Sequence, residues 1–368
     1  MKLGVPKETA VNERRVALTP EHAGRLVKSG PAVLVEGGAG EAASFPDDAY
    51  RAAGVTLVGT AAELFGQSDV ILKVQPPSPA EVQLCRDGSA LIALFQPSAE
   101  REVVSQLAAR KVTVFSLALL PRITRAQAMD VLSSQATVAG YKAVLLAAAA
   151  AGRLFPMLVT AAGTLPPARV LVLGAGVAGL QAIATARRLG AVVAAFDVRA
   201  AVKEQVESLG AKFLEMQVGE DAATAGGYAK ELSADAHRRE LEFLARAVKD
   251  ADVVITTAAI PGKRAPVLVT GDAVRGMNPG AVIVDLAAET GGNCELTEAG
   301  GDVVKHGVRI LGPLNLPSTL PFHASQMYAR NISSFLTLLV KDGALRLDFD
   351  DEIVRDTCVT HAGEVRKT

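Results

Sequence analysis

RVLVLGAGVAG, residues 169–179, is an apolar strand that runs directly into three glycines at GxGxxG spacing, Gly174, Gly176 and Gly179. The first glycine permits a tight turn from strand to helix, the second lets backbone amides approach a pyrophosphate, and the third lets the helix pack closely on the strand. The helix that begins near Val177 then faces the anion with its partial positive charge. We interpret this stretch as a Rossmann-type dinucleotide site; the alternative is a purely structural turn.

The end of the next strand bears on which nucleotide is bound. This strand, Ala191 to Phe196, ends at Asp197, 18 residues beyond Gly179 and close to the spacing of roughly 20 expected for a ribose-binding acid. A carboxylate there accepts a hydrogen bond from a ribose 2′-hydroxyl and repels a 2′-phosphate, so NAD(H) is favoured over NADP(H). Arg199 is the residue type that holds the phosphate in NADP sites, but Asp197 carries more weight because it occupies the strand end itself.

The composition is that of a folded α/β protein rather than a nucleic-acid-binding or disordered chain. Its 368 residues are long enough for two domains, 49% are hydrophobic, and the formal net charge is −1. The three cysteines are widely spaced, without a CxxC pair or a histidine cluster, so neither a disulfide framework nor a metal site is predicted and the compartment is expected to be reducing.

Targeting and membrane segments are not predicted. The N-terminus has no apolar h-region, and the most apolar run, Ala143 to Gly152, is shorter than the roughly 18 residues that a spanning helix requires.

Alternating strand and helix patterns predict two doubly wound, Rossmann-like α/β lobes with a cleft between them. Residues 1–130 form the N-terminal lobe, which residues 312–368 complete, and residues 131–311 form the NAD(H)-binding lobe. A long helical pattern from about Thr124 to Ala151 should bridge them, and a last helix over about His323 to Val340 should return to the first lobe.

One segment, Gln217 to Asp235, has no apolar periodicity and is long for a connection inside a compact domain. It contains the pair Gly226 and Gly227 and a single aromatic residue, Tyr228. Two interpretations stay open: a surface insertion, or a lid whose tyrosine closes over the bound nucleotide.

Two further stretches carry a family resemblance over nearly the whole chain. VPKETAVNERRVALTPEH, Val5 to His22, and VIVDLAAETGGNCE, Val282 to Glu295, resemble the alanine dehydrogenase and pyridine nucleotide transhydrogenase superfamily. The two branches of this superfamily do different chemistry, so individual residues decide between them.

The residues typical of alanine dehydrogenases match only in part. Arg15 and Lys73 fit the arginine and lysine of that branch, but Gln96 stands at its histidine position and Glu289 at its aspartate position. Oxidation of an amino acid moves protons as well as hydride, and a glutamine cannot act as a general acid or base. These departures argue against alanine oxidation.

The other branch fits better. PRITRAQAMDVLSSQATVAGYKA, Pro121 to Ala143, resembles the signature loop and helix of the NAD(H)-binding component, domain I, of proton-translocating transhydrogenase. There the resemblance implies an arginine, a glutamine and an aspartate against the nicotinamide, which by position are Arg122, Gln127 and Asp130. Altogether it implies a nucleotide site made of Arg122, Gln127, Asp130, Ser133, Gly174, Gly176, Val177, Gly179, Asp197, Arg199, Gly227, Tyr228 and Ala259. Glu240 departs from the glutamine expected in some relatives.

The resemblance implies direct hydride transfer between NADH on this chain and NADP⁺ on a partner subunit. It also implies membrane-spanning partners that couple the transfer to proton translocation, a homodimer, and a cytoplasmic location at the inner face of the membrane. The segment Phe155 to Pro167 could form a hairpin at the dimer contact, or an internal edge strand; Arg15 and Lys73 are given no catalytic role. The rival functions are an NAD-dependent alanine or related amino-acid dehydrogenase and a module that senses NAD(H) without chemistry.

Overall fold

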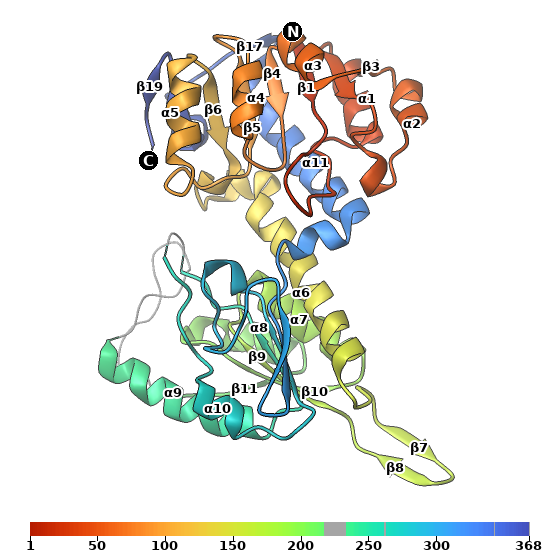
Figure 1. Cartoon of the computed structure of the whole chain (residues 1–368), viewed down its shortest axis with the longest axis vertical. Helices are drawn as coiled ribbons and strands as arrows, with labels where there is room; N and C mark the ends of the chain where they lie inside the picture. The colour runs from red at the N-terminus through yellow and green to blue at the C-terminus, as the bar shows by residue number, and fades with distance from the viewer. Residues whose placement is uncertain (217–232, 261–262, 342, 368) are drawn as a thin grey trace. The chain divides into compact units, whose positions relative to one another are not determined.

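The chain divides into two compact units, each built around its own β-sheet (Figure 1). The structure is a computed structural model that describes residues 1–216, 233–260, 263–341 and 343–367. Unit 1 comprises Met1–Gln135 and Pro317–Thr368, and unit 2 comprises Ala136–Leu316. Both units alternate strands with helices, which confirms the predicted α/β class with Rossmann-like sheets.

Unit 1 has an eight-stranded sheet in the order β19-β18-β6-β5-β4-β1-β2-β3. The pairs from β6 to β3 are parallel, and the C-terminal strands β18 and β19 add antiparallel pairs at one edge. In chain order the strands are β1 (Lys2–Val5), β2 (Ala32–Glu36), β3 (Thr56–Val58), β4 (Val70–Leu72), β5 (Ala90–Ala93), β6 (Thr113–Ser116), β18 (Cys358–His361) and β19 (Glu364–Val365).

Helices cover both faces of the unit 1 sheet because its central strands are buried on both sides. One face packs on α1 (Pro20–Lys28), α2 (Asp47–Ala52), α11 (Pro321–Leu339) and α12 (Glu352–Thr357), in a core that includes Phe115 and Phe335. The other face packs on α3 (Ala61–Gln67), α4 (Pro79–Leu84) and α5 (Arg101–Ala109). The last long helix, α11, therefore contributes to the core of unit 1.

Unit 2 has a seven-stranded sheet in the order β11-β10-β9-β12-β13-β15-β14, parallel except for β14. One face packs on α6 (Val131–Ala150), α7 (Val177–Arg188) and α8 (Lys203–Ser208), and the other on α9 (Ala234–Lys249) and α10 (Gly271–Arg275). The strands are β9 (Arg169–Leu173), β10 (Val192–Phe196), β11 (Lys212–Phe213), β12 (Val253–Thr256), β13 (Val282–Asp285), β14 (Asp302–Lys305) and β15 (Val308–Leu311).

The expected helix from Thr124 to Ala151 is wrong as a single element. A 3-10 helix, Thr124–Met129, ends at Asp130, and α6 begins at the next residue. The Asp130 carboxylate accepts a hydrogen bond from the backbone N–H of Ser133 at 2.9 Å, which is the geometry of a helix N-cap. An aspartate offers the backbone this local partner in place of a continuing helix, so the helical pattern breaks there.

Helix α6 is long and apolar enough, by length and composition, to be a candidate membrane span, with 39% of its most apolar window buried. Its buried residues Ala143, Val144 and Ala147 belong to the core of unit 2. Residues that fill a protein core in this way are typical of a buried helix, which passes the same test of length and composition.

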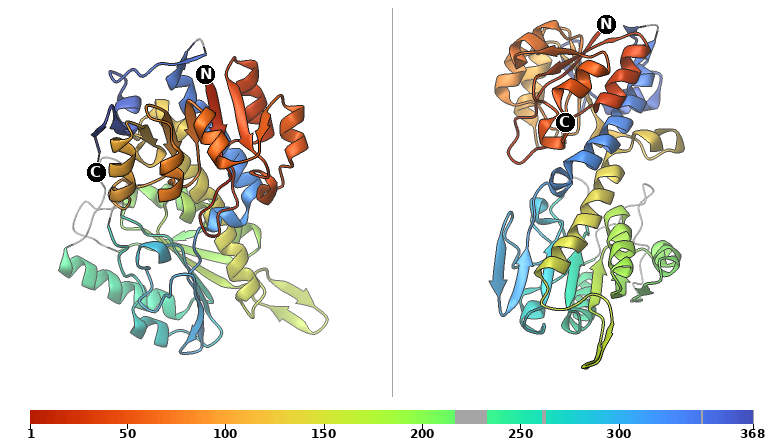
Figure 2. Two further views of the ribbon diagram at one scale, coloured as in Figure 1. Left: turned by 45° about the horizontal axis from the view of Figure 1, so that its top comes forward. Right: turned by 90° about the vertical axis from the view of Figure 1, so that its right-hand side faces the viewer.

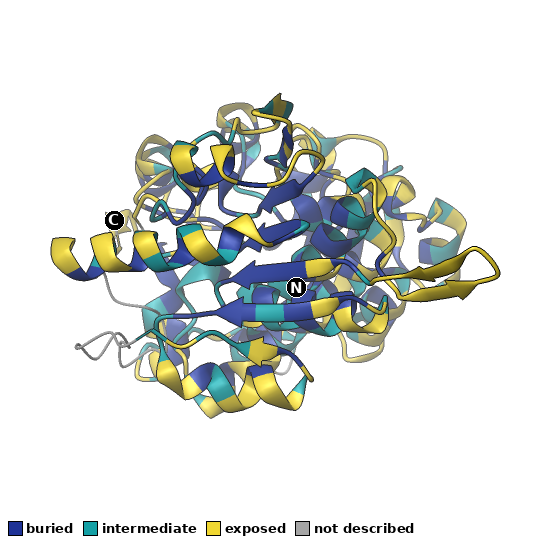
Figure 3. Cartoon of the chain, turned by 90° about the horizontal axis from the view of Figure 1, so that it is seen from below, coloured by how far each residue is buried: buried dark blue, intermediate teal, exposed yellow. Residues whose placement is uncertain are grey.

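A short hairpin projects from unit 2 (Figures 1 and 2). Its strands, β7 (Leu158–Thr160) and β8 (Gly163–Leu165), pair with each other in a separate sheet, and every residue in them is exposed (Figure 3). Of the two interpretations of Phe155 to Pro167, the hairpin is the one that the structure contains.

Candidate dinucleotide-binding site

The glycine-rich turn has the geometry that its spacing predicts. It follows β9, and Gly174 has a φ of +97°, a conformation that L side chains rarely adopt. A Cβ added to Gly179 would lie 1.9 Å from the Gly174 carbonyl oxygen, so only glycine lets α7 start so close to the strand. A Cβ added to Gly176 would meet no atom of the described residues within 4 Å, so among these residues this side of the turn is open to a ligand.

The first residues of α7 offer backbone N–H groups at the carboxyl edge of the unit 2 sheet. Val177 is the first residue of the helix and is 39% exposed. Unpaired N–H groups at a helix N-terminus attract phosphate through direct hydrogen bonds and the helix dipole. The turn and the helix together can therefore hold a pyrophosphate.

Asp197 lies directly after β10 and is paired with Arg199. The arginine Nε donates to one carboxylate oxygen at 2.8 Å, and its Nη2 donates to the other at 2.7 Å. The carboxylate also accepts the backbone N–H of Ala175 at 2.7 Å, which ties the strand end to the glycine-rich turn. In the sequence, Asp197 favours NAD and Arg199 favours NADP. In the structure these two residues form a bidentate ion pair with each other.

The segment after β12 lies at the same edge of the sheet and contacts the glycine-rich turn. Thr257 donates its hydroxyl to the Gly174 carbonyl at 3.0 Å. The buried Asn293 accepts the Ala258 N–H at 3.0 Å and donates to the Ala258 carbonyl at 2.9 Å. These bonds fix the segment, and the next residue, Ala259, is exposed beside it.

A buried aspartate that the sequence analysis did not single out organises the end of β13. Asp285 is fully buried and accepts four hydrogen bonds, two of them from the hydroxyls of Thr256 at 2.9 Å and Thr297 at 2.7 Å. Because every donor is in place, the carboxylate holds the ends of two adjacent strands and the following loop rigidly. Its position at the end of an apolar strand was the available signal.

Gly140 is a second missed residue. A Cβ there would lie 2.1 Å from the backbone oxygen of Ala178, so α6 passes against the first turn of α7 at glycine-only distance. This contact supports the N-terminus of α7, which directly follows the glycine-rich turn.

Unit 1 carries the predicted arginine, glutamine and aspartate on one loop after β6. Arg122 and Gln127 are exposed, and Asp130 is half-buried. Both oxygens of Asp130 are engaged by Ser133, one by its N–H at 2.9 Å and one by its hydroxyl at 2.6 Å. Asp130 and Ser133 are therefore brought together, and the exposed Gln127 sits on the preceding 3-10 turn.

Two contacts anchor this loop to unit 1. Asn331 donates its side-chain amide to the carbonyl of Ala128 at 2.8 Å. Arg125 pairs with Asp351 through two hydrogen bonds of 2.6 and 2.7 Å. This hydrogen-bonded guanidinium lowers the pKa of Asp351 to about 2. The loop that presents Gln127 is thus held on both sides of it.

The predicted lid residues Gly227 and Tyr228 lie outside the described residues. Among the residues that the structure does describe, no group of three or more His, Cys, Asp or Glu side chains could hold a metal ion.

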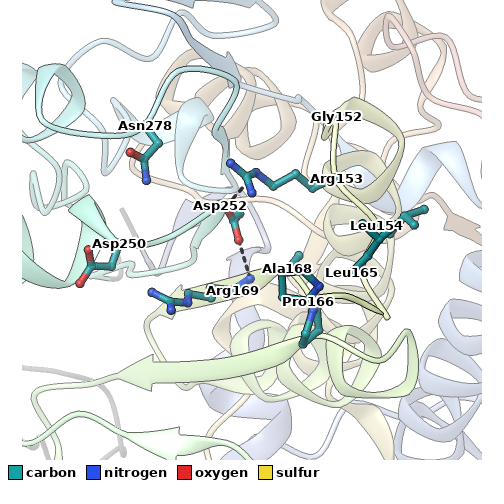
Figure 4. Close-up of a pocket in the computed structure, with 11 residues that line it drawn as sticks. Gly152, Arg153, Leu154, Leu165, Pro166, Ala168, Arg169, Asp250, Asp252 and Asn278 are labelled. Atoms are coloured by element: carbon teal, nitrogen blue, oxygen red, sulfur yellow. Dashed lines mark hydrogen bonds and ion pairs between the residues drawn. The ribbon is translucent and has the colours of Figure 1, made fainter. Parts of the chain in front are cut away.

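A pocket on unit 2 of about 450 Å³ lies apart from the glycine-rich turn (Figure 4). It is lined by residues before and at the start of β9, by two residues just before β12 and by one before β13, whereas the glycine-rich turn follows the end of β9. Arg153 pairs there with Asp252 at 3.1 Å, and Asp252 also accepts the Arg169 N–H at 2.8 Å. The pocket is therefore at the amino edge of the sheet, opposite the edge where nucleotides bind in such folds.

Comparison with known proteins decides the family. The model of the alanine dehydrogenase/PNT N-terminal domain matches residues 4–139, and that of the C-terminal domain matches residues 143–368. The chain belongs to the alanine dehydrogenase/PNT family. This confirms the resemblance that the sequence motifs carry.

Three relatives within the alanine dehydrogenase/PNT family show which branch the chain resembles more, and of these the two transhydrogenase proteins have the higher identity. It is 51% identical over 374 residues to an NAD(P) transhydrogenase subunit alpha chain of Rhodospirillum rubrum, covering 99% of this chain and 97% of the relative. A transhydrogenase crystal structure from Sinorhizobium meliloti aligns with a TM-score of 0.91 at 47% identity, over 99% of this chain and 100% of that one. The alanine dehydrogenase of Mycobacterium tuberculosis is 35% identical over 295 residues, covering 79% and 74%.

The two cations that match the alanine dehydrogenase branch of the family are buried in ion pairs. Lys73, 1% exposed, contacts Glu81 at 2.8 Å and Glu8 at 3.2 Å. Arg15, 3% exposed, donates to both oxygens of Glu13 at 2.8 and 2.6 Å. Each cation is already matched by carboxylates of unit 1 itself.

The other two positions that distinguish the branches are on the surface. Gln96 is exposed after β5, and Glu289 is exposed and accepts the backbone N–H of Asn315 at 2.5 Å. Of these two side chains, that of Gln96 cannot exchange a proton with a substrate, because a glutamine is neither an acid nor a base.

Burial and charge act in opposite directions on the cluster of Lys73, Glu8 and Glu81. Burial raises the pKa of Glu8 above its ordinary value, and the nearby Lys73 offsets this only in part. Burial lowers the pKa of Lys73, but the two carboxylates outweigh it and the pKa stands above its ordinary value. The lysine therefore stays charged, as a structural counter-ion to the two acids.

Proposed function

We propose that this chain is the NAD(H)-binding component of a proton-translocating transhydrogenase, in which hydride passes directly between NADH on this chain and NADP⁺ on a partner subunit. The observation that carries the proposal is that Lys73 and Arg15 are neutralised by Glu8, Glu81 and Glu13 inside unit 1. Neither cation is then available to hold the carboxylate of an amino-acid substrate. The identity to transhydrogenase alpha subunits along nearly the whole chain supports the same choice.

The chemistry of the proposed reaction fits the residues present. Bound NADH supplies a hydride, and the acceptor is another nicotinamide ring, so no substrate proton has to be added or removed. The chain's contribution is then to fix the position of one ring. The exposed amide of Gln127, on a loop anchored by Arg125 and Asn331, can both donate and accept hydrogen bonds for this purpose.

Arg122, Asp130 and Ser133 are proposed to contact the nucleotide from the same loop and helix start as Gln127, and further proposed contacts lie on unit 2. Gly174, Gly176, Gly179 and the first turn of α7 would hold the pyrophosphate, and Asp197 would accept the ribose hydroxyl hydrogen bond. The proposed preference is accordingly for NAD(H), with NADP(H) bound by the partner.

The partners are proposed on the same basis. They are an NADP(H)-binding beta subunit and membrane-spanning subunits, with this chain at the cytoplasmic face of the membrane. A homodimer is also proposed, and the exposed apolar side chains at and beside the hairpin support it: Met157, Leu158, Val159 and Leu165 are 40–74% exposed.

The division of labour is tested by reconstitution without a membrane. The purified chain alone should transfer no hydride from NADH to NADP⁺, because the two rings must approach within about 3–3.5 Å and the sequence has one glycine-rich turn of this type. Adding a separately purified NADP-binding subunit should create activity in a stopped-flow assay. Rapid transfer by the chain alone, or alanine-dependent NADH formation, would refute the proposal; NADH binding without transfer after mixing would favour a sensing module.

Gln127→Asn should slow hydride transfer much more than it weakens NADH binding. The change shortens the side chain by one methylene while keeping its amide, so the ring would be misplaced although the pyrophosphate and ribose contacts stay. We expect a rate loss of about 100-fold, the order expected for a misplacement of about 1 Å. Gln67→Asn, on α3, is the matched control. Parallel losses of rate and affinity would assign Gln127 to binding alone.

A further inference from the structure

Helix α9 carries a carboxylate on its buried face. The buried residues of this helix are Ala236, Glu240, Leu244 and Val248, spaced four residues apart along one side. The other three residues are apolar, whereas Glu240 carries a carboxylate and is nevertheless only 3% exposed. A buried acid at such a position costs stability unless it is paired, so it is an unusual residue for the packed face of a helix.

Packing brings the turn of α9 that carries Glu240 against the end of β10, which Asp197 directly follows. One turn after Glu240, Phe243 contacts Phe196, with ring centroids 5.6 Å apart. Phe196 is the last residue of β10 and directly precedes Asp197. Burial raises the pKa of Glu240, the hydrogen bond and the charge of His237 lower it, and the charge of Asp197 raises it by a smaller amount. The charge of each of these two carboxylates therefore acts on the other.

The charges at this edge do not contribute equally. Asp197 is bound through both oxygens by the guanidinium of Arg199, at 2.8 and 2.7 Å, so its charge is locally balanced. Glu240 has a weaker partner: His237 Nδ1 lies 2.8 Å from one of its oxygens, and an imidazole is charged only when protonated. The ion pair of Asp197 and Arg199 alone thus presents little net charge to an approaching 2′-phosphate.

We propose that Glu240 is a specificity-determining residue of this site, supplying negative charge that rejects dinucleotides with a 2′-phosphate while Asp197 and Arg199 neutralise each other. The inference rests on the proposed NAD(H)-binding function and deepens it. A phosphate that is dianionic or nearly so would be brought into a partly buried region beside a second carboxylate, where charge repulsion is strong because solvent screening is weak. A ribose hydroxyl has no such penalty, so NAD(H) is admitted.

The proposal is tested by measuring NADH and NADPH affinities of the full chain by titration calorimetry, with displacement of NADH for the weaker ligand. Glu240→Gln keeps size and hydrogen-bonding capacity but removes the charge. It should tighten NADPH binding by about tenfold and change NADH affinity by less than about threefold. Glu240→Asp, which keeps the charge, should retain the original preference. Glu242→Gln, at an exposed position of the same helix, controls for net charge and should change neither affinity.

The outcomes separate the two levels of inference. If the unmodified chain binds NADH, and Glu240→Gln leaves the ratio of the two affinities unchanged, the role of Glu240 is refuted while the proposed function stands. The same conclusion follows if Glu242→Gln narrows the preference equally, or if Glu240→Asp loses it. If the unmodified chain binds no NADH, the proposed function fails and this inference fails with it. NADH binding by each variant also reports that its site is folded.

Discussion

Lys73→Met should lower the free energy of unfolding by about 3–5 kcal/mol, the cost of removing one partner from a buried charge cluster. Lys73 is 1% exposed and stands between Glu8 and Glu81. Methionine fills a similar volume, so the loss would come from two buried carboxylates without their counter-ion rather than from a cavity. Chemical denaturation of the full chain, followed by circular dichroism, measures it.

The pH dependence of this loss has a definite sign. Without the lysine, the folded-state pKa of Glu8, which burial already raises, would rise further above its unfolded value. A group with a raised folded pKa contributes stability that is fully present below its unfolded pKa and is lost as the pH rises through its folded pKa. The variant should therefore be least stable relative to the unmodified chain at pH 8 and recover toward pH 5.

The control for this prediction is an exposed pair on the same unit. Arg25 and Glu21 lie 2.6 Å apart on α1 with both side chains more than half exposed. Arg25→Met should cost no more than about 0.5 kcal/mol, as solvent and salt screen such pairs. Equal losses for Arg25→Met and Lys73→Met would mean that the buried cluster has no special role in stability.

The parts of the fold that could be predicted from the sequence are those encoded locally. β9, the glycine-rich turn and α7 follow from an apolar run and glycine spacing within a dozen residues, and the structure contains them. β18 and β19, in contrast, were not predicted. These strands have four and two residues, and β18 pairs with β6, more than 200 residues earlier in the chain.

The same distinction between local and long-range information applies to the candidate site. Asp197 could be found because it follows a strand at a characteristic distance. Its neutralisation by Arg199 could not be derived, because the same spacing of two residues also allows the arginine to point to a phosphate. Asn293 and Gly140 were missed because their partners, Ala258 and Ala178, are more than 30 residues away in the sequence.

Gly179→Ala and Gly176→Ala should separate two requirements of the glycine-rich turn, that of packing and that of ligand approach. At Gly179 a methyl group would lie 1.9 Å from a backbone oxygen, so α7 and the strand must move apart. We expect a loss of about 3 kcal/mol or more in unfolding free energy, at or above the upper end of overpacking costs. NADH affinity should fall with it, because the helix N-terminus is displaced.

At Gly176 the outcome should be different. The added methyl meets no atom within 4 Å in the part of the chain that the structure describes, so the fold should change in stability by less than about 1 kcal/mol. NADH affinity should nevertheless fall by at least about tenfold, because the methyl occupies the space through which backbone amides reach the pyrophosphate. Gly66→Ala, inside α3 and equally open, is the control and should leave both quantities nearly unchanged.

Thermal melts measure the stability of each of the three variants, and NADH titrations measure its affinity for NADH. Gly179→Ala should be low in both, Gly176→Ala low in affinity alone, and Gly66→Ala low in neither. Full NADH affinity in Gly176→Ala would show that the pyrophosphate does not approach this turn, because an alanine Cβ cannot share the volume of a phosphate in hydrogen-bond contact with the adjacent amides. The glycine-rich turn would then be a structural element only.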